Sequence, residues 1–176
     1  MLPILLALAF VALLLFIAVA GQPDDFVFLR RTKMAAPPER IFPRVNELRQ
    51  WEPWNPWGKL DPNCRMTYDG PAAGVGASYS WAGNNKVGAG RSTIIESRPD
   101  ELVRLRLDFL KPMVATNTAE FTFQPEGGQT LVTWAMAGKN STRGKIFGLF
   151  VNCEKMCGRQ FEQGLAQMKS LVEARD

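Results

Sequence analysis

The stretch LVRLRLDFL at residues 102–110 alternates between apolar and charged side chains. One parity is wholly apolar and consists of Val103, Leu105, Leu107 and Phe109. Because successive side chains of a β-strand point to opposite faces, this alternation predicts a strand with one packed face and one face in water. A strand of this kind is typical of an antiparallel sheet that has its core on one side only.

The same alternation continues from Arg65 to Gly138 in short segments that are divided by turn residues. Apolar residues share one strand face at three further places: Tyr79 with Trp81, Phe121 with Phe123, and Val132 with Trp134 and Met136. The segments are separated by three turn sequences: GNN at 83–85, RPDE at 98–101 and PEGGQ at 125–129. We therefore expect five or six antiparallel strands joined by short turns.

The C-terminal segment changes to helical spacing. Its apolar residues recur every three or four positions: Ile146, Phe150, Cys153, Cys157, Phe161, Leu165, Met168 and Val172. This spacing predicts one apolar stripe that faces the sheet. Four glycines in the segment lower its helical propensity, so we expect a break near Asn152 that divides a short helix from a long one.

Two further elements are expected before the meander. FVFLRRTKM at 26–34 is typical of a strand. APPERIFPRVNEL at 36–48 is expected to begin a short helix, because the N–H groups that its first prolines lack have no partner within the first turn of a helix. WEPWNPWGKLDP at 51–62 then places three tryptophans at three-residue intervals with prolines between them. These prolines oppose a regular helix or a central strand, so the stretch is expected to be an irregular connection.

The N-terminal segment from Leu2 to Ala20 carries no charged side chain and is long enough to cross roughly 30 Å of hydrocarbon as a helix. Two interpretations remain open. AVAG at 18–21 offers a cleavage site of the kind found in signal peptides, but the basic start of such peptides is missing. We favour a retained single-span membrane anchor over residues 1–21, followed by one domain over 22–176. Basic residues just beyond the segment place that domain in the cytoplasm, although the side of the membrane stays open.

Charge and composition exclude several classes of protein. The net charge is +4, from 21 Lys and Arg against 17 Asp and Glu, and the longest basic run is Arg30–Arg31. Nucleic acid is therefore not an expected partner, because phosphate binding needs clustered basic side chains. A mildly basic surface fits an anionic membrane leaflet better.

Catalytic and metal-binding patterns are also missing from the sequence. The chain has no histidine, and its three cysteines form no C-x-x-C motif, so neither a familiar zinc pattern nor a Ser-His or Cys-His arrangement is present. Its acidic residues include Asp61, Asp69, Glu96, Glu120 and Glu154, which are scattered over turns and outward strand faces. We name no catalytic, cofactor-binding or metal-binding residue from the sequence.

Several motifs together resemble the SRPBCC superfamily, and most closely its bacterial polyketide cyclase/dehydrase-like branch with an N-terminal transmembrane segment. They are APPERIF at 36–42, WEPWNPW at 51–57 with Asp61 and Pro62, GPAAGVGASYSWAGNNKVGAG at 70–90 and FEQGLAQMKSLVE at 161–173. The resemblance implies an α+β fold of the helix-grip, or START-like, type, in which a curved antiparallel sheet surrounds a long C-terminal helix. Members of the superfamily hold lipids, sterols, polyketides, quinones or plant hormones, and only some of them are enzymes.

The resemblance also places a ligand cavity between the sheet and the C-terminal helix. The tryptophans of residues 51–57 then become candidates for an aromatic lip that clamps an apolar ligand. The ligand-binding candidates are Trp54, Trp57, Tyr79, Trp81, Asn117, Phe121, Trp134 and Phe150. The competing interpretation is that these aromatic residues are ordinary core and that Asn117 is satisfied by a neighbouring backbone group.

The sequence thus predicts a membrane-anchored protein that binds a hydrophobic small molecule or lipid. Two alternatives stay open: an enzyme similar to polyketide cyclases and dehydrases, and a protein-interaction module at the membrane. A chain without histidine or an identifiable carboxylate pair has few ways to lower a chemical barrier, which favours binding over catalysis.

Overall fold

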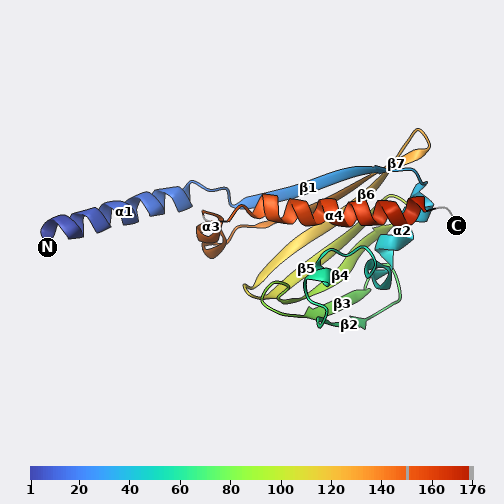
Figure 1. Ribbon diagram of the computed structural model, residues 1–176, viewed down its shortest axis with the longest axis horizontal. Helices are drawn as coiled ribbons and strands as arrows, with labels where there is room; N and C mark the ends of the chain where they lie inside the picture. The colour runs from blue at the N-terminus through green and yellow to red at the C-terminus, as the bar shows by residue number, and fades with distance from the viewer. Residues whose placement is uncertain (150, 175–176) are drawn as a thin grey trace.

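The structure is a computed structural model that describes residues 1–149 and 151–174. It consists of one apolar helix that projects from an α+β domain in which a curved sheet surrounds a long helix (Figure 1). The helices are α1 (Leu2–Ala20), α2 (Pro38–Asn46), α3 (Thr142–Gly148) and α4 (Cys153–Glu173), with two 3-10 turns, η1 (Leu48–Trp51) and η2 (Trp57–Leu60).

The sheet has seven strands in the order β1-β7-β6-β5-β4-β3-β2, and every neighbouring pair is antiparallel. The strands are β1 (Asp25–Met34), β2 (Arg65–Asp69), β3 (Ser78–Ala82), β4 (Ala89–Arg98), β5 (Leu102–Lys111), β6 (Ala115–Glu126) and β7 (Gln129–Lys139). The predicted meander is confirmed with six strands, and the three predicted turns lie between them. β2 to β7 are neighbours in the order of the chain, whereas β1 lies at the edge of the sheet and pairs with β7.

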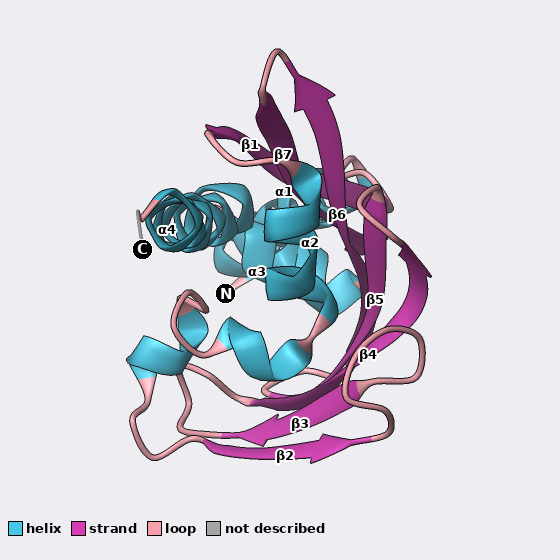
Figure 2. Ribbon diagram, turned by 90° about the vertical axis from the view of Figure 1, so that its right-hand side faces the viewer, coloured by secondary structure: helices cyan, strands magenta, loops and turns pink. Residues whose placement is uncertain are grey.

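The sheet curves around the helices, as the view along the long axis of the molecule shows (Figure 2). The predicted stripe of α4 is buried from Phe161 onward, at Phe161, Leu165, Met168 and Val172. Two glycines let the helix approach closely: a Cβ atom on Gly158 would collide with the guanidinium of Arg30, and one on Gly164 would lie 2.9 Å from Trp134. The glycines that weaken the helix in isolation therefore permit its packing in the fold.

The predicted break in the C-terminal segment is confirmed. Both new helices begin at a side-chain cap, since Ser141 accepts a hydrogen bond from the backbone of Gly144 and Asn152 accepts one from that of Lys155. Each cap satisfies one of the N–H groups that a helix start leaves without a partner. The N-terminal part of the stripe is less covered, because Ile146 is exposed and Cys153 is half-buried. Phe150 lies outside the described residues.

The tryptophan segment is more regular than expected, because η1 and η2 organise it into two short turns. Trp51 donates its indole N–H to the carbonyl of Val45 at 2.9 Å, and Trp54 donates to the carbonyl of Arg44 at 3.2 Å. Both acceptors lie in the last turn of α2, where helix carbonyls lack partners within the helix. The segment is thus fastened to α2 and directed into the interior.

α1 contains 19 residues, and none of them is buried against the rest of the chain. It is long and apolar enough to span a membrane, with a mean hydropathy of 3.1. Its connection to the domain is held by Lys145 of α3, whose ammonium donates to the carbonyl of Gln22 at 2.9 Å and to the carboxylate of Asp24 at 2.6 Å. Gln22 donates in return to the carbonyl of Lys145.

Candidate functional site

The middle of the concave side is filled by a central aromatic cluster, which consists of Trp51, Trp54, Phe121, Trp134 and Phe161. Trp134 stacks on Phe161 with ring centroids 4.3 Å apart, and Trp54 meets Phe121 edge to face at 6.0 Å. All five side chains are buried. Aromatic pairs at such distances contribute roughly 0.5–1.5 kcal/mol beyond the burial of their area. The cluster therefore joins the sheet, α4 and the tryptophan segment into one core.

The predicted ligand-binding residues divide into three groups by position. Trp54, Phe121 and Trp134 belong to the central aromatic cluster, and Trp57 lies half-buried at its border, 5.5 Å from the ring of Trp134. Their packing within the cluster fits the role of core. Their predicted contact with a ligand stays a prediction.

Tyr79 and Trp81 lie farther along the sheet, on β3. Tyr79 is buried, and this burial raises the pKa of its hydroxyl far above the ordinary value, so the group stays neutral. Trp81 is half-buried and donates its indole N–H to the carbonyl of Val87 at 3.3 Å. These two residues are thus brought near each other, with ring centroids 5.8 Å apart.

Asn117 points to the concave side, because it has the same parity on β6 as buried Phe121, and it is half-buried. Its amide oxygen lies so close to Gly138 that a Cβ atom at that position would collide with it, and Phe26 covers the same glycine. Asn117 is therefore the predicted residue that lies toward α1. Of the last candidate, Phe150, nothing is described.

A wide hollow of the described structure lies beside α1 and not beside the tryptophans. We call it the α1-end groove, and its volume is about 550 Å³. It lies between β1, α3 and the start of α4 and is lined by Gln22, Pro23, Phe26, Phe28, Asn140, Gly144, Gly148, Leu149, Val151, Asn152, Cys153 and Glu154. None of the described ligand-binding candidates lines it.

The α1-end groove has an apolar wall and a polar border. Phe26 and Phe28 stack with ring centroids 4.7 Å apart and form the apolar wall on β1. Gln22 and Asn140 are occupied by hydrogen bonds within the chain, to the carbonyls of Lys145 and Pro23. Such a lining fits an amphipathic molecule, whose apolar part can cover the two rings while its polar part stays at the border.

A second hollow of about 210 Å³ lies between η1 and the β2–β3 connection. Its lining includes Arg49 and Tyr68, and the Arg49 guanidinium lies 4.4 Å from the centroid of the Tyr68 ring. Ligand pockets usually measure about 300–1,000 Å³, so this hollow is small for a lipid or polyketide.

The two cysteines of the C-terminal segment occupy different surroundings. Cys153 lines the α1-end groove, whereas Cys157 lies one turn farther along α4 and packs against the core. Burial, and secondarily the neighbouring Cys153, raises the pKa of the Cys157 thiol to about 11. All three cysteines of the chain are free thiols.

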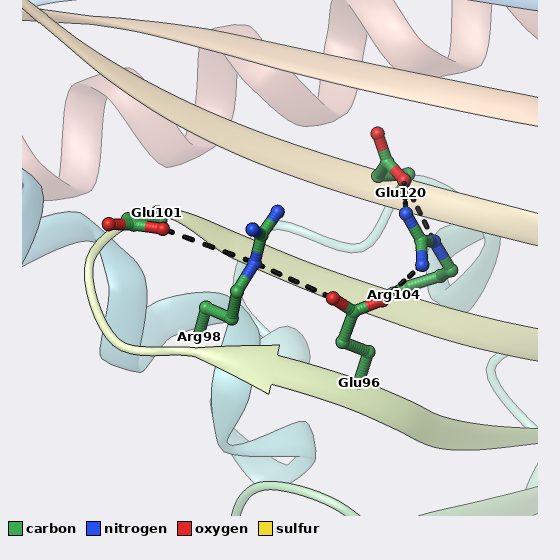
Figure 3. A network of polar contacts seen from close by, with 5 residues as sticks. All are labelled: Glu96, Arg98, Glu101, Arg104 and Glu120. Carbon is green, nitrogen blue, oxygen red and sulfur yellow. Dashed lines mark hydrogen bonds and ion pairs between the residues drawn. The ribbon is translucent and has the colours of Figure 1, made fainter.

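The acidic residues that could serve as acids or bases have structural partners instead. On the convex face, Arg104 lies between Glu96 and Glu120, and its Nη2 is 2.7 Å from Glu120 Oε2 (Figure 3). The hydrogen bond that Arg104 donates to Glu120 is the first cause of a raised pKa of the Arg104 guanidinium. Asp69 pairs with Arg91 at 2.9 Å, and this hydrogen bond lowers the pKa of the Asp69 carboxyl. These carboxylates therefore pair with arginines of the sheet.

Asp61 is the buried exception, and it too has a structural task. Its oxygens accept hydrogen bonds from the backbone of Asn63 at 3.0 Å and of Asn84 at 2.7 Å, which ties the tryptophan segment to the β3–β4 connection. Within residues 1–149 and 151–174, no three metal-binding side chains come together.

The curved sheet and the helix inside it define an α+β helix-grip fold. A family model described as Polyketide cyclase / dehydrase and lipid transport matches residues 28–173, and the chain belongs to this family. The predicted resemblance to the SRPBCC superfamily is thereby confirmed. Among curated proteins no relative matches the sequence.

Solved structures of low sequence identity share the fold. CV1439 from Chromobacterium violaceum aligns with a TM-score of 0.61 at 16% identity, over 88% of this chain and 100% of that chain. Ms6760 from Mycobacterium smegmatis gives 0.59 at 19% identity, over 85% and 92%. The di-domain ARO/CYC protein BexL from the BE-7585A biosynthetic pathway gives 0.61 at 16% identity, over 90% of this chain and 53% of BexL. At these identities the likeness shows the fold alone.

Sequence reasoning missed the residues of the α1-end groove. Phe26 and Phe28 were recognised as part of a strand, but nothing in their alternation says which end of a sheet face stays uncovered. A partial indication was present in the glycines at 144 and 148, which leave small surfaces opposite these two rings.

Proposed function

We propose that this protein binds a hydrophobic or amphipathic small molecule, such as a lipid, in the α1-end groove, while α1 anchors it in a membrane. The observation that carries the proposal is the groove itself. Its volume of about 550 Å³ falls within the usual range of ligand pockets, roughly 300–1,000 Å³, and stacked Phe26 and Phe28 form its wall.

The position of the groove supports a link between ligand and membrane. Gln22 and Pro23 belong both to its lining and to the short connection that follows α1. A helix of 19 residues is about 28 Å long, which matches the roughly 30 Å of a hydrocarbon core. A ligand could thus pass between bilayer and groove over a short path. Arg30, Arg31 and Lys33 follow the anchor, which favours a cytoplasmic domain in this proposal.

Binding is preferred over catalysis because the described groove offers little acid–base chemistry. The ionisable groups in its lining are Glu154, whose carboxylate lies 3.6 Å from Arg30 Nη1, and the Cys153 thiol. Neither is paired with a second group that would activate it for proton transfer or nucleophilic attack. A cyclase- or dehydrase-like activity remains the alternative that the experiment below can reveal.

The test uses the full chain extracted in a mild detergent. Native mass spectrometry is expected to show a co-purified lipid. After the lipid is removed, a saturating fatty acid should slow the alkylation of Cys153, which lines the groove, and leave that of Cys64 unchanged. Equal alkylation of Cys153 with and without the fatty acid, together with no bound lipid, would contradict the proposal. Turnover of a polyketide-like substrate would favour the enzyme instead.

A further inference from the structure

We infer that the end of the domain next to α1 is a docking surface for the lipid bilayer, formed by the tip of the β5–β6 hairpin and by α3. We call these segments, residues 110–114 and 142–149, the docking end. The inference goes beyond ligand binding, because it concerns how the whole domain lies on the membrane. It rests on the insertion of α1 and on no property of the groove.

The hairpin tip is apolar where a tip in water would be polar. Its sequence is LKPMV, and Leu110, Met113 and Val114 are all exposed, Val114 to 83%. Turns in water usually carry glycine, asparagine, aspartate or serine. Exposed apolar side chains gathered at one place mark a surface that contacts a protein or a membrane.

α3 adds a second exposed apolar group. Ile146 and Phe147 of this helix and Leu149 directly after it are exposed, although they lie within a domain that buries most of its large apolar side chains. An amphipathic helix of this kind can lie in the interface of a bilayer with its apolar side toward the acyl chains.

The strand register brings the two segments to the same end of the sheet. Phe26 of β1 pairs with Gly138 of β7, which pairs with Asn117 of β6, and Asn117 pairs with Leu107 of β5. Residues 108–116 therefore extend beyond this row on the side where α1 and α3 join the domain. Figure 1 shows the β5–β6 end and α3 at the end of the domain that faces α1.

The connection that follows α1 is held to the docking end. Lys145 holds the carbonyl of Gln22 and the carboxylate of Asp24, and the backbone N–H of Asn140 donates to the carbonyl of Asp24 at 2.7 Å. These contacts fix the connection after α1 to α3. If α1 crosses the bilayer, these contacts keep the docking end close to the leaflet at which α1 ends.

Charge also fits an anionic leaflet. Lys86, Lys111 and Arg143 are exposed at this end and form no ion pair with any described residue. Lys86 belongs to the β3–β4 connection, which reaches the same end because Ala89 pairs with Lys111. Basic side chains near an anionic membrane surface are attracted to it, and they outnumber Asp25, an exposed acidic residue of this end that forms no ion pair with a described residue.

The opposite end of the domain has a different character. The β4–β5 turn there consists of Arg98, Pro99, Asp100 and Glu101, and the β6–β7 turn is formed by residues 126–129 with the sequence EGGQ. Val75 is the large apolar residue that is exposed on that side. The contrast between the two ends indicates that the apolar tip is a specific feature of the end beside α1.

The test places a photo-reactive benzophenone side chain at Val114 of the full chain, reconstituted in nanodiscs of anionic and neutral phospholipids. Matched controls carry the same group at Phe10 of α1 and at Gln129 of the opposite turn, both of which are exposed. After irradiation, mass spectrometry should find lipid adducts at positions 10 and 114 and none at 129. No ligand is added, so the result is independent of the groove.

Two outcomes would overturn the inference. Adducts at position 10 without adducts at 114, or adducts at 114 no more frequent than at 129, would show an anchored domain that stands away from the bilayer. A lack of adducts at position 10 would show that α1 does not insert in the membrane, which contradicts the premise of the inference.

Discussion

The two halves of the concave side share one sheet and one helix, yet one half is filled and the other is hollow. On the side of α2, α4 buries Phe161 within the central aromatic cluster and Leu165 one turn farther along. Beside α1, the N-terminal start of α4 leaves Cys153 on a groove of about 550 Å³. The comparison teaches that a concentration of aromatic residues here marks the filled half and not the binding half.

The physical reason lies in what each connection contributes. The tryptophan segment contributes the indole groups of Trp51 and Trp54, which fill the space under the sheet and donate their N–H groups to carbonyls of α2. The connection at the other end contributes Gly144 and Gly148, which have no side chain to fill the space opposite Phe26 and Phe28. Close packing elsewhere makes such a hollow conspicuous.

The largest expected effect is on the filled half. Trp54 is fully buried, so Trp54→Ala should lower the free energy of unfolding by about 3–5 kcal/mol through lost burial and a remaining cavity. Denaturant unfolding of the variant and the parent in the same detergent measures the change. In the fraction that stays folded, affinity for an apolar probe should be unchanged. A loss below about 1 kcal/mol would show that this half is not a packed core.

The second effect concerns the alkylation rate of Cys157, which packs against the core, whereas Cys153 lines the α1-end groove. Because the Cys157 pKa is about 11 against an ordinary 9.0, its thiolate is on the order of 100-fold scarcer near pH 8, and its alkylation should be slower by a similar factor than in the unfolded chain. The sign is set by burial, which favours the neutral thiol, so the rate should keep rising until the pH approaches 11.

Peptide mapping after alkylation measures the rates of Cys153 and Cys157 in one sample. A rate for Cys157 that levels off near pH 9 would contradict the packed surroundings assigned to it.

The third effect concerns the wall of the groove. Phe28→Ala should weaken binding of an apolar ligand by about tenfold, because a half-buried phenylalanine contributes roughly 1–2 kcal/mol when a ligand covers it. Leu29→Ala is the matched control, since Leu29 is exposed on the opposite face of the same strand. Titration of both variants with a fluorescent fatty acid gives the two affinities. Equal affinities of the two variants would show that the ligand does not bind in the α1-end groove.

The smallest effect is expected at the border of the central aromatic cluster. Trp57→Ala should change ligand affinity by less than about twofold, because Trp57 packs on Trp134 and Phe161 and does not line the groove. The same titration measures it. A loss of roughly 5- to 150-fold would instead support the aromatic lip that the sequence predicted.

Most of the fold could be predicted from the sequence. The alternation around Leu105, the spacing of Phe161, Leu165 and Met168, and the turn at residues 125–129 each report a local rule, and the structure follows all of them. These rules depend on neighbours a few residues apart, which a single sequence displays directly.

The candidate site could not be predicted in the same way. Trp54 contacts either a ligand or Phe121, depending on how far the tryptophan segment extends toward the sheet. That position is set by contacts such as the hydrogen bond from the Trp54 indole to the carbonyl of Arg44. The hollow beside Phe28 likewise depends on the path of α3, far away in the sequence. Strand parity indicated which candidates share an inward face, such as Phe121 and Trp134, but not whether a ligand or the core covers them.

The most direct test of the central claim is to find where a ligand touches the protein. A fatty acid with a diazirine group on its chain is bound to the full protein and irradiated, and the labelled residues are mapped by mass spectrometry. We expect labels within residues 22–28, 144–149 and 151–154, the segments that contribute lining residues to the α1-end groove. Labels concentrated within residues 51–57, or on Phe121 and Trp134, would show that the ligand enters the aromatic half and would contradict the account.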